Sequence, residues 1–173
     1  MADEDDDPSL IPRGASLEDL VELCRELNSH GARYIVVGGF AIRAAGYLRE
    51  TNDIDLIVDL EPENEAKVLK SLEYLPDKAI RELQPGEIAQ YTVVRVNDEV
   101  TVDLMKSACG LAYDDLAQDV VVREVGGVSI PFASPKKLWL MKQTYRGKDA
   151  VDRLFLKQLL GDDLPQTPPL PSV

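Results

Sequence analysis

The sequence predicts a mixed α/β (α+β) fold, with helices packed on a mixed β-sheet and a helical C-terminal part. An apolar, β-branched run at residues 34–37 precedes Gly38-Gly39 and a stretch of apolar residues at helical spacing, which indicates a strand, a turn and a helix. Residues 53–58 then alternate between acidic and apolar side chains, as in a half-buried strand. Two hairpin signals and two helical segments follow, and the last helices are expected at about 134–160.

The first half of the chain begins with a helix that carries its own start signal. Ser16 is a typical N-cap, and Asp19 three residues later is an acidic near-match to a capping box. Apolar residues follow at helical spacing until the chain reaches Asn28 to Gly31, where the helix should end. The further elements predicted here are a strand at 34–37, a helix ending at Gly46, a strand at 53–58, a helix at 62–74 and a short helix at 77–83.

The second half reads as two hairpins, each followed by helical segments. Asn97-Asp98 and Gly126-Gly127 are the turn signals. Ser134-Pro135 places an N-cap residue before a proline at the first helical position. The predicted elements are strands at 89–96 and 99–105, a helix at 108–117, strands at 120–125 and 128–132, a helix from 134 to 145 or 146, and a last helix at 149–160.

Length and composition suggest one domain between two tails. The chain has 173 residues, enough for a single domain with a real core. We expect a disordered acidic tail at residues 1–14, a single domain at 15–162 and a Pro-rich tail at 163–173. These bounds follow from the acidic run at 3–7 and from the prolines that begin at Pro165.

Net charge, apolar runs and cysteine spacing indicate which partners and which cellular compartment to expect. The net charge of −12 argues against general affinity for nucleic acids or membranes, although a basic segment near the C-terminus keeps a tRNA partner open. No apolar run approaches the ~20 residues that a membrane helix needs, and the acidic N-terminus lacks the pattern of a signal peptide. Cys24 and Cys109 show no ligand spacing, so we expect reduced thiols in a cytoplasmic protein.

Two carboxylates on the strand at 53–58 are the first functional signal. Side chains two residues apart on a strand point to the same face, with Cα atoms roughly 6–7 Å apart. Asp53 and Asp55 should therefore project together while Ile54 and Leu56 enter the core. A divalent cation such as Mg²⁺ would relieve their repulsion, whereas a solvated strand face is the alternative.

Gly38-Gly39 is the second signal, because it places a flexible backbone at the end of the preceding strand. Glycine allows a sharp turn and the close approach of another group. Free N–H groups at the start of the following helix would suit a phosphate, and a simple strand-to-helix turn is the alternative. A phosphate cradle and a metal-binding pair would thus lie within one supersecondary unit.

This combination resembles a known signature. Val37-Gly38-Gly39, followed after thirteen residues by Asp53-Ile54-Asp55-Leu56, is similar to the motif of the DNA polymerase β-like nucleotidyltransferase superfamily. The segment at 49–55 resembles the small, minimal members, including the AbiEii-type toxins. The superfamily has a third carboxylate on a later strand, for which Asp103 is the candidate here.

The resemblance implies an enzyme that transfers a nucleoside monophosphate from a nucleoside triphosphate to a hydroxyl acceptor. Asp53, Asp55 and Asp103 would hold two Mg²⁺ ions, and Asp103 would also help to deprotonate the acceptor. Gly38 and Gly39 would contact the β- and γ-phosphates through their N–H groups. The acceptor stays open between a tRNA, a protein side chain and a small molecule.

Three further side chains are candidates for binding the nucleotide. Arg49 would neutralise a phosphate or orient the carboxylates, and Thr51 would form a hydrogen bond beside the metal site. Lys142, with Arg146 and Lys148, would reach the triphosphate or the acceptor. A surface arginine and a solvated helix face are the alternatives.

Two other functional classes compete with an enzyme of this kind. A dinucleotide-binding unit would explain a strand, a glycine pair, a helix and an acid at Asp59, but further glycines of that motif are missing and Asp53 and Asp55 are left without a role. A catalytically silent fold that acts as a binding module, or as part of a toxin–antitoxin pair with a partner protein, is the stronger rival. The single histidine, His30, has no chemical partner in the sequence and receives no role.

Overall fold

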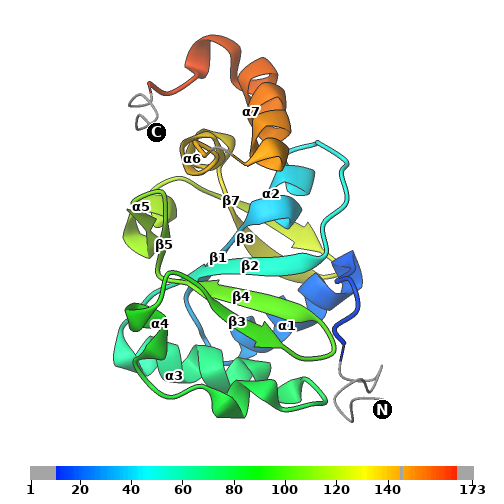
Figure 1. Ribbon diagram of the computed structural model, residues 1–173, viewed down its shortest axis with the longest axis vertical. Helices are drawn as coiled ribbons and strands as arrows, with labels where there is room; N and C mark the ends of the chain where they lie inside the picture. Colours follow the sequence, from blue (N-terminus) through cyan, green and yellow to red (C-terminus); the bar gives the residue numbers. More distant parts are fainter. Residues whose placement is uncertain (1–10, 145, 167–173) are drawn as a thin grey trace, which may run out of the picture.

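A six-stranded mixed sheet forms the centre of the computed structural model, which describes residues 11–144 and 146–166. The strand order is β3-β4-β2-β1-β8-β7 (Figure 1). The sheet and its covering helices confirm the mixed α/β class. The strands are β1 (Tyr34–Val37), β2 (Asp53–Val58), β3 (Val94–Asn97), β4 (Thr101–Met105), β7 (Val120–Val125) and β8 (Val128–Ala133), with β5 (Ser107–Ala108) and β6 (Leu111–Ala112) in a small separate ladder.

Parallel and antiparallel pairs alternate across the sheet. β1 runs antiparallel to β2 and parallel to β8, and β2 runs parallel to β4. β3 with β4 and β7 with β8 form the two antiparallel hairpins that the turn signals predict. The second half of the chain therefore adds one hairpin to each side of the central β1–β2 pair.

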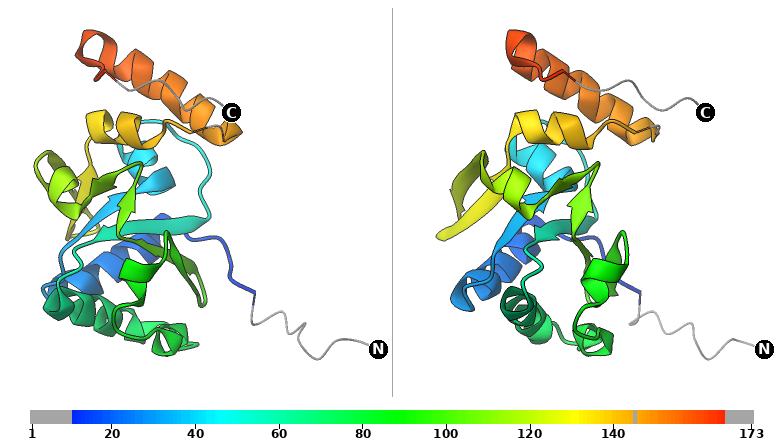
Figure 2. Two further views of the ribbon diagram at one scale, coloured as in Figure 1. Left: turned by 60° about the vertical axis from the view of Figure 1, so that its left-hand side comes forward. Right: turned by 90° about the vertical axis from the view of Figure 1, so that its left-hand side faces the viewer.

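Helices cover both faces of the sheet. Figures 1 and 2 show α1 and α3 on one face, and α2, α6 and α7 on the other. The α-helices are α1 (Leu17–Ser29), α2 (Gly38–Ala44), α3 (Pro62–Ser71), α4 (Glu87–Gln90), α5 (Tyr113–Ala117), α6 (Pro135–Met141) and α7 (Gly147–Leu160), and the 3₁₀ turns are η2 (Leu72–Tyr74), η3 (Ala79–Glu82) and η4 (Gly161–Asp163). α2 and α6 both contribute residues to the cavity that contains the predicted site residues.

The start of α1 shows the predicted capping box. The Ser16 hydroxyl accepts a hydrogen bond from the backbone N–H of Asp19, and the Asp19 carboxylate accepts one from the backbone N–H of Ser16. Arg13 adds a bidentate ion pair to Asp19, which lowers the pKa of that carboxyl to about 2. Local chemistry therefore fixes where this helix begins.

The core is built from the central strands and the apolar faces of the helices. All residues of β1 are buried, and in β2 Ile54, Leu56, Ile57 and Val58 are buried while the two aspartates are partly exposed. Leu20, Leu23 and Leu27 of α1 are fully covered. The polar side chains of β2 thus point away from a densely apolar interior, as the alternation predicts.

Several predicted elements are shorter than expected. The strand expected at 89–96 is replaced by the short helix α4 and the strand β3. The helix expected at 108–117 begins only at Tyr113, because Cys109 and Gly110, with φ of +49° and +78°, form the turn between β5 and β6. The helix expected to reach 145 or 146 ends at Met141. Arg153 donates hydrogen bonds to the carbonyls of Lys142 and Thr144. Carbonyl groups just after the end of α6, which lack partners within the helix, are thereby satisfied.

The predicted tails lie largely outside the described residues. Residues 1–10 and 167–173 are outside that range. Arg13, which the sequence assigns to the acidic tail, forms a β-bridge to Val100 and donates its N–H to the carbonyl of Glu99 at 3.0 Å. The domain boundaries stay predictions. Across 11–144 and 146–166, none of the helices has both the length and the apolar character that crossing a bilayer requires.

Candidate functional site

The registers of three neighbouring strands bring the sequence motifs together. Val37, the last residue of β1, pairs with Asp55 of β2, and Asp55 in turn pairs with Asp103 of β4. Because paired residues on adjacent strands point to the same face, the Gly-Gly step, Asp55 and Asp103 lie side by side. The sequence alone could not establish this register, since β2 and β4 are separated by more than forty residues.

The two glycines have no room for a side chain. Gly38 has φ of +68°, and a Cβ built on it would lie 2.1 Å from Oδ2 of Asp55. A Cβ on Gly39 would lie 2.3 Å from Oγ1 of Thr51 and 3.2 Å from Nη1 of Arg49. The start of α2 is therefore pressed against Asp55 and Thr51, a contact that only glycine permits.

One cavity of about 910 Å³ is lined by the eight principal candidate residues of the sequence analysis. Its walls come from β2, β3 and β4, from the start of α2, from the loop before β2, and from α6 and α7. Arg95, Arg146 and Lys148 also line it. The predicted residues in its wall are Gly38, Gly39, Arg49, Thr51, Asp53, Asp55, Asp103 and Lys142.

Three carboxylates on one side of the cavity repel one another. The pKa of Asp55 is raised from its ordinary value to about 7, first by burial and then by the neighbouring charges of Asp103 and Asp53. Asp103 is buried, whereas the side chain of Asp53 is 40% exposed. A cation placed among these three carboxylates would offset their repulsion and favour the ionised form of Asp55.

Arg95 supplies such a positive charge, and sequence reasoning missed it. It lies on β3, directly opposite Asp103. Its Nε and Nη2 donate to the two carboxylate oxygens of Asp103 at 2.9 and 3.0 Å, and Nη2 lies 3.5 Å from Oδ2 of Asp53. The bidentate pair is the strongest hydrogen-bonded contact that a carboxylate and a guanidinium can form.

The sequence predicts the hairpin that contains Arg95, but the register of that hairpin decides which residue lies opposite the arginine. A two-residue turn at Asn97-Asp98 would place Val100 opposite Arg95. The observed ladder pairs Asn97 with Thr101, so residues 98–100 form the turn. The buried Asp98 carboxylate accepts hydrogen bonds from the backbone N–H groups of Asp77, Ala79 and Glu99, which favours the longer turn.

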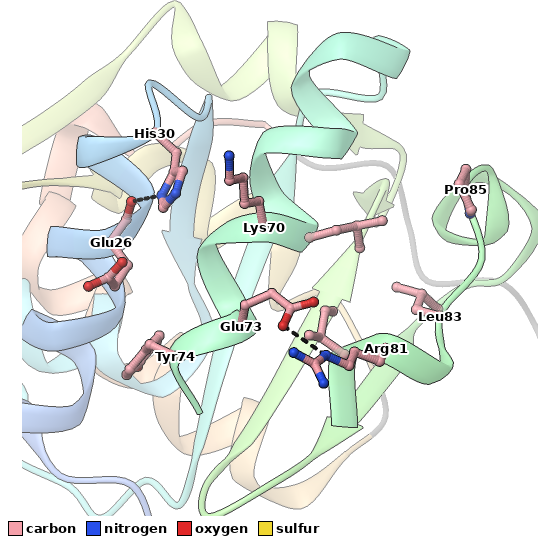
Figure 3. Close-up of a pocket in the computed structure, with 10 residues that line it drawn as sticks. Glu26, His30, Lys70, Glu73, Tyr74, Arg81, Leu83 and Pro85 are labelled. Carbon is pink, nitrogen blue, oxygen red and sulfur yellow. Dashed lines mark hydrogen bonds and ion pairs between the residues drawn. The ribbon is translucent and has the colours of Figure 1, made fainter. Parts of the chain in front are cut away.

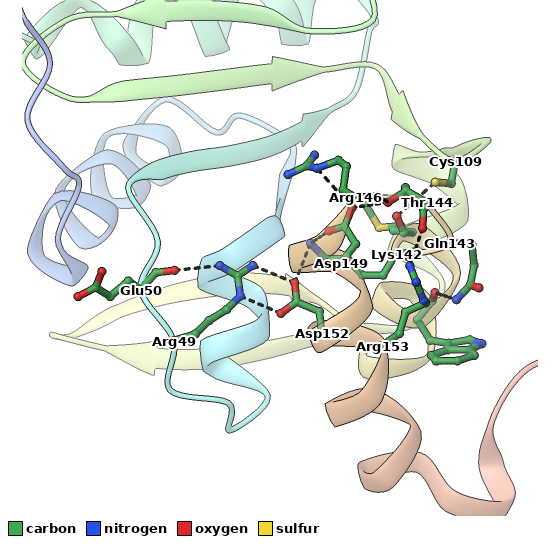
Figure 4. Close-up of polar contacts among 12 residues, drawn as sticks. Arg49, Glu50, Cys109, Lys142, Gln143, Thr144, Arg146, Asp149, Asp152 and Arg153 are labelled. Carbon is green, nitrogen blue, oxygen red and sulfur yellow. Dashed lines mark hydrogen bonds and ion pairs between the residues drawn. The ribbon is translucent and has the colours of Figure 1, made fainter.

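Arg49 and Lys142 reach the cavity, but both are already paired with acids of α7. Nε and Nη2 of Arg49 bind the two oxygens of Asp152 at 2.8 and 2.9 Å (Figure 4). Nζ of Lys142 lies 3.1 Å from Asp149 and 3.2 Å from Asp152. Both acids are buried, so the network joins the loop before β2 to α6 and α7. Arg49 and Lys142 therefore connect the cavity wall to the C-terminal helices through buried ion pairs.

Thr51 is held close to the start of β2. Its hydroxyl lies 3.4 Å from the carbonyl of Asp53, and the same hydroxyl limits the space above Gly39. Arg146 reaches Asp149 at 3.5 Å with a largely exposed side chain. Within the described ranges, Lys148 has no acidic partner at ion-pair distance, and Arg146 has only the 3.5 Å contact to Asp149. These two cavity bases are therefore less tightly paired than Arg49 and Lys142.

The donor set suits a hard divalent cation, although the carboxylates are not arranged around one. Among residues 11–144 and 146–166, no group of three or more His, Cys, Asp or Glu side chains has the geometry of a metal site. Asp103 presents both of its oxygens to Arg95 instead. Three carboxylates on adjacent strands, one with a raised pKa, are nevertheless the oxygen ligands that Mg²⁺ prefers.

A second cavity of about 870 Å³ lies between α1, α3, η2 and η3 and contains none of the predicted site residues. His30 lines it, with its ring Nδ1 at 2.8 Å from the carbonyl of Glu26 (Figure 3). Glu73 and Arg81 form an ion pair across it. Among its described lining residues, this cavity contains no carboxylate pair or glycine step of the predicted site, and His30 still receives no role.

Comparison with known proteins identifies a family for this chain. The sequence matches the family described as "Nucleotidyl transferase of unknown function (DUF2204)" over residues 16–160. No curated protein matches it significantly.

Solved structures of low sequence identity share the fold. The lincosamide antibiotic adenylyltransferase LnuA, bound to lincomycin, superposes with a TM-score of 0.55 at 16% identity over 84% of this chain and 99% of LnuA. An antigenic nucleotidyltransferase-like protein from Paracoccidioides brasiliensis gives 0.54 at 16% identity over 85% and 78% of the two chains. A putative nucleotidyltransferase (TM1012) from Thermotoga maritima gives 0.50 at 19% identity over 84% and 92%.

These structures are similar in architecture, and the family match covers the whole segment from the N-cap of α1 to the end of α7. That segment contains the glycine pair, the three carboxylates and the cavity that they line. The chain therefore belongs to the nucleotidyl transferase family DUF2204.

Proposed function

We propose that the protein transfers a nucleoside monophosphate from a nucleoside triphosphate to a hydroxyl acceptor in a Mg²⁺-dependent reaction. The observation that carries this proposal is the strand register, which aligns Val37, Asp55 and Asp103 on three adjacent strands and so brings Gly38-Gly39, at the start of α2, into the same cavity wall. The family match and the nucleotidyltransferase-like fold support the same reaction class.

Asp53, Asp55 and Asp103 would hold two Mg²⁺ ions. When bound, such ions offset the charge of the triphosphate and stabilise the attacking and leaving oxygens of an in-line displacement. Gly38 and Gly39 line the same cavity, where their backbone N–H groups would donate to the β- and γ-phosphates. Asp103 would take part in deprotonating the acceptor hydroxyl, and pyrophosphate would leave.

The basic side chains divide into two groups in this proposal. Arg49 and Lys142 are bound to Asp149 and Asp152, so they would shape the cavity wall and contribute to binding only at longer range. Lys148 and Arg146 would supply the direct positive charge for the triphosphate. Thr51 would fix the approach of the backbone at Gly39.

A catalytically silent binding module is the second candidate, and one observation favours it. The pair between Arg95 and Asp103 satisfies both oxygens of the third carboxylate without any metal. A protein of this kind would bind nucleotides or a partner protein, and the resemblance to AbiEii-type toxins makes a toxin–antitoxin context one such hypothesis.

A label-transfer experiment separates the two candidates. The protein is incubated with Mg²⁺ and nucleoside triphosphates labelled at the α-phosphorus, together with tRNA, protein, aminoglycoside and lincosamide acceptors. We expect label to appear in one acceptor class and to fall to background in Asp53→Asn and Asp55→Asn variants.

The matched control is Asp119→Asn, since Asp119 is exposed and lies outside the cavity. It should retain full transfer. Nucleotide binding without transfer to any acceptor, unaffected by Asp103→Asn, would support the binding module in place of the enzyme.

A further inference from the structure

Arg95 donates hydrogen bonds to both carboxylate oxygens of Asp103, one of the three proposed metal ligands. We propose that Arg95 is a positioning residue that holds Asp103 in the metal-free protein and competes with the divalent cation for it. This inference rests on the proposed function, because it concerns the metal that the three carboxylates would bind. It adds a residue that the sequence motif does not include.

While the pair persists, both carboxylate oxygens of Asp103 accept hydrogen bonds from Arg95. Nε binds Oδ1 at 2.9 Å and Nη2 binds Oδ2 at 3.0 Å. The same guanidinium lies 3.5 Å from Asp53, so it faces two of the three proposed ligands. A hard cation and a guanidinium prefer the same carboxylate oxygens, and both cannot occupy the bidentate position at once.

The two partners differ in their freedom to move. The Asp103 side chain is 7% exposed on a strand with neighbours on both sides, whereas the Arg95 side chain is 56% exposed. Arg95 lies on β3, the edge strand of the sheet, and its other described ion-pair contact is only the long one to Asp53. Exchange would therefore occur by rotation of the arginine away from a fixed carboxylate.

The guanidinium would remain in the same cavity after it leaves Asp103. Arg95 lines the cavity together with Gly38, Gly39 and Lys148. A positive side chain released by metal binding would then be available to the polyphosphate that accompanies the metal. Arg95 thus keeps the acidic cluster partly neutralised while no metal is bound.

The test measures metal affinity in the absence of nucleotide. Mn²⁺ binding is followed by the electron paramagnetic resonance signal of the free ion and by calorimetry, for the wild type and for Arg95→Gln and Arg95→Lys. We expect Mn²⁺ to bind Arg95→Gln about tenfold more tightly or better, from the usual strength of a charge-assisted bidentate pair. Arg95→Lys should be intermediate, because lysine offers a point charge without the planar fork.

Two controls separate competition from a general structural effect. Arg123→Gln removes an exposed arginine from the other edge strand, β7, and should leave Mn²⁺ affinity unchanged. In an Asp103→Asn background, Arg95→Gln should no longer raise the affinity for Mn²⁺, because the carboxylate for which the arginine and the metal compete is absent. Circular dichroism melts report the stability of each variant separately.

The outcomes distinguish the inference from the proposed function. If Arg95→Gln binds Mn²⁺ no more tightly than the wild type and Arg123→Gln, while the wild type binds Mn²⁺ with ATP and transfers label, the inference is overturned and the proposed function stands. If no protein in the set binds Mn²⁺ with or without ATP, both are overturned.

Discussion

At the scale of single residues, the site depends on two glycines, whose lack of a side chain lets the backbone approach the neighbouring residues closely. Gly38 and Gly39 bring the backbone of α2 into contact with Asp55 and Thr51. A residue with a Cβ at either position would push the helix away from β2 or displace the side chains that face the cavity. The glycine pair was identified from sequence spacing, but the identity of the groups that it touches depends on the register of β1 and β2.

A Gly38→Ala variant tests this packing. Alanine at a φ of +68° is strained by about 1 kcal/mol, and its Cβ would overlap Asp55, which adds about 1–3 kcal/mol. We expect the free energy of unfolding in urea to fall by the sum of these two costs and nucleotide binding to be lost.

Gly147→Ala is the matched control. Nothing lies within 4 Å of the Cβ position at Gly147, and its φ is not in the left-handed region. This variant should be as stable as the wild type or slightly more stable. Equal stability of the Gly38→Ala and Gly147→Ala variants would show that the close contact at Gly38 is not needed.

At the scale of elements, a buried ion network fastens α6 and α7 to the loop that precedes β2. Asp152 is fully buried and accepts from Arg49, and Lys142 lies between Asp152 and Asp149. Charges taken out of water in this way depend on their partners, since an unpaired buried charge is strongly unfavourable. The network therefore couples the wall of the cavity to the C-terminal helices.

Removing one acid of this ion network should lower the stability of the protein. Asp152→Asn leaves Arg49 and Lys142 without their shared carboxylate, which we expect to cost about 3–5 kcal/mol. For a chain of this length, that loss corresponds to a decrease in melting temperature of roughly 10 °C. Thermal melts followed by circular dichroism measure it.

The exposed Asp162 in η4 provides the comparison, because Asp162→Asn removes an acid without a buried partner. This variant should melt within about 2 °C of the wild type. A small decrease for Asp152→Asn as well would mean that the ion network contributes little to holding the helices.

The elements also show where sequence reasoning reaches its limit. Local signals sufficed for the cap of α1 at Ser16, for β1 and β2, and for the hairpin at Gly126-Gly127, because neighbouring residues determine each of them. The hairpin of β3 and β4 was found but not its register, since the buried side chain of Asp98 reaches a distant loop. Arg95 was overlooked for that reason.

At the scale of the whole molecule, the site is assembled from segments far apart in the chain. The parallel pairing of β2 with β4 and of β1 with β8 depends on crossovers that no local pattern specifies. The family motif anticipated that Asp103 would join the earlier pair, and the sheet places it opposite Asp55. That the bases Arg49 and Lys142 are paired with α7 followed only from the packed structure.

The charge distribution of the molecule bears on the acceptor. The chain has a net charge of −12, and the cavity mixes acids and bases in its wall. A negative net charge opposes the binding of an extended nucleic acid. If the proposed transfer is correct, we therefore expect a small or locally bound hydroxyl acceptor rather than a long polynucleotide.

The central claim is that the glycine pair and the aspartates form a site for a nucleotide with its divalent cation. Isothermal titration calorimetry with Mg²⁺ and non-hydrolysable nucleoside triphosphate analogues tests it most directly. We predict saturable binding of at least one analogue to the wild type and to Asp119→Asn, with affinity at least about tenfold weaker for Asp55→Asn. Absence of binding to the wild type, or equal affinity of the wild type and Asp55→Asn, would contradict the account.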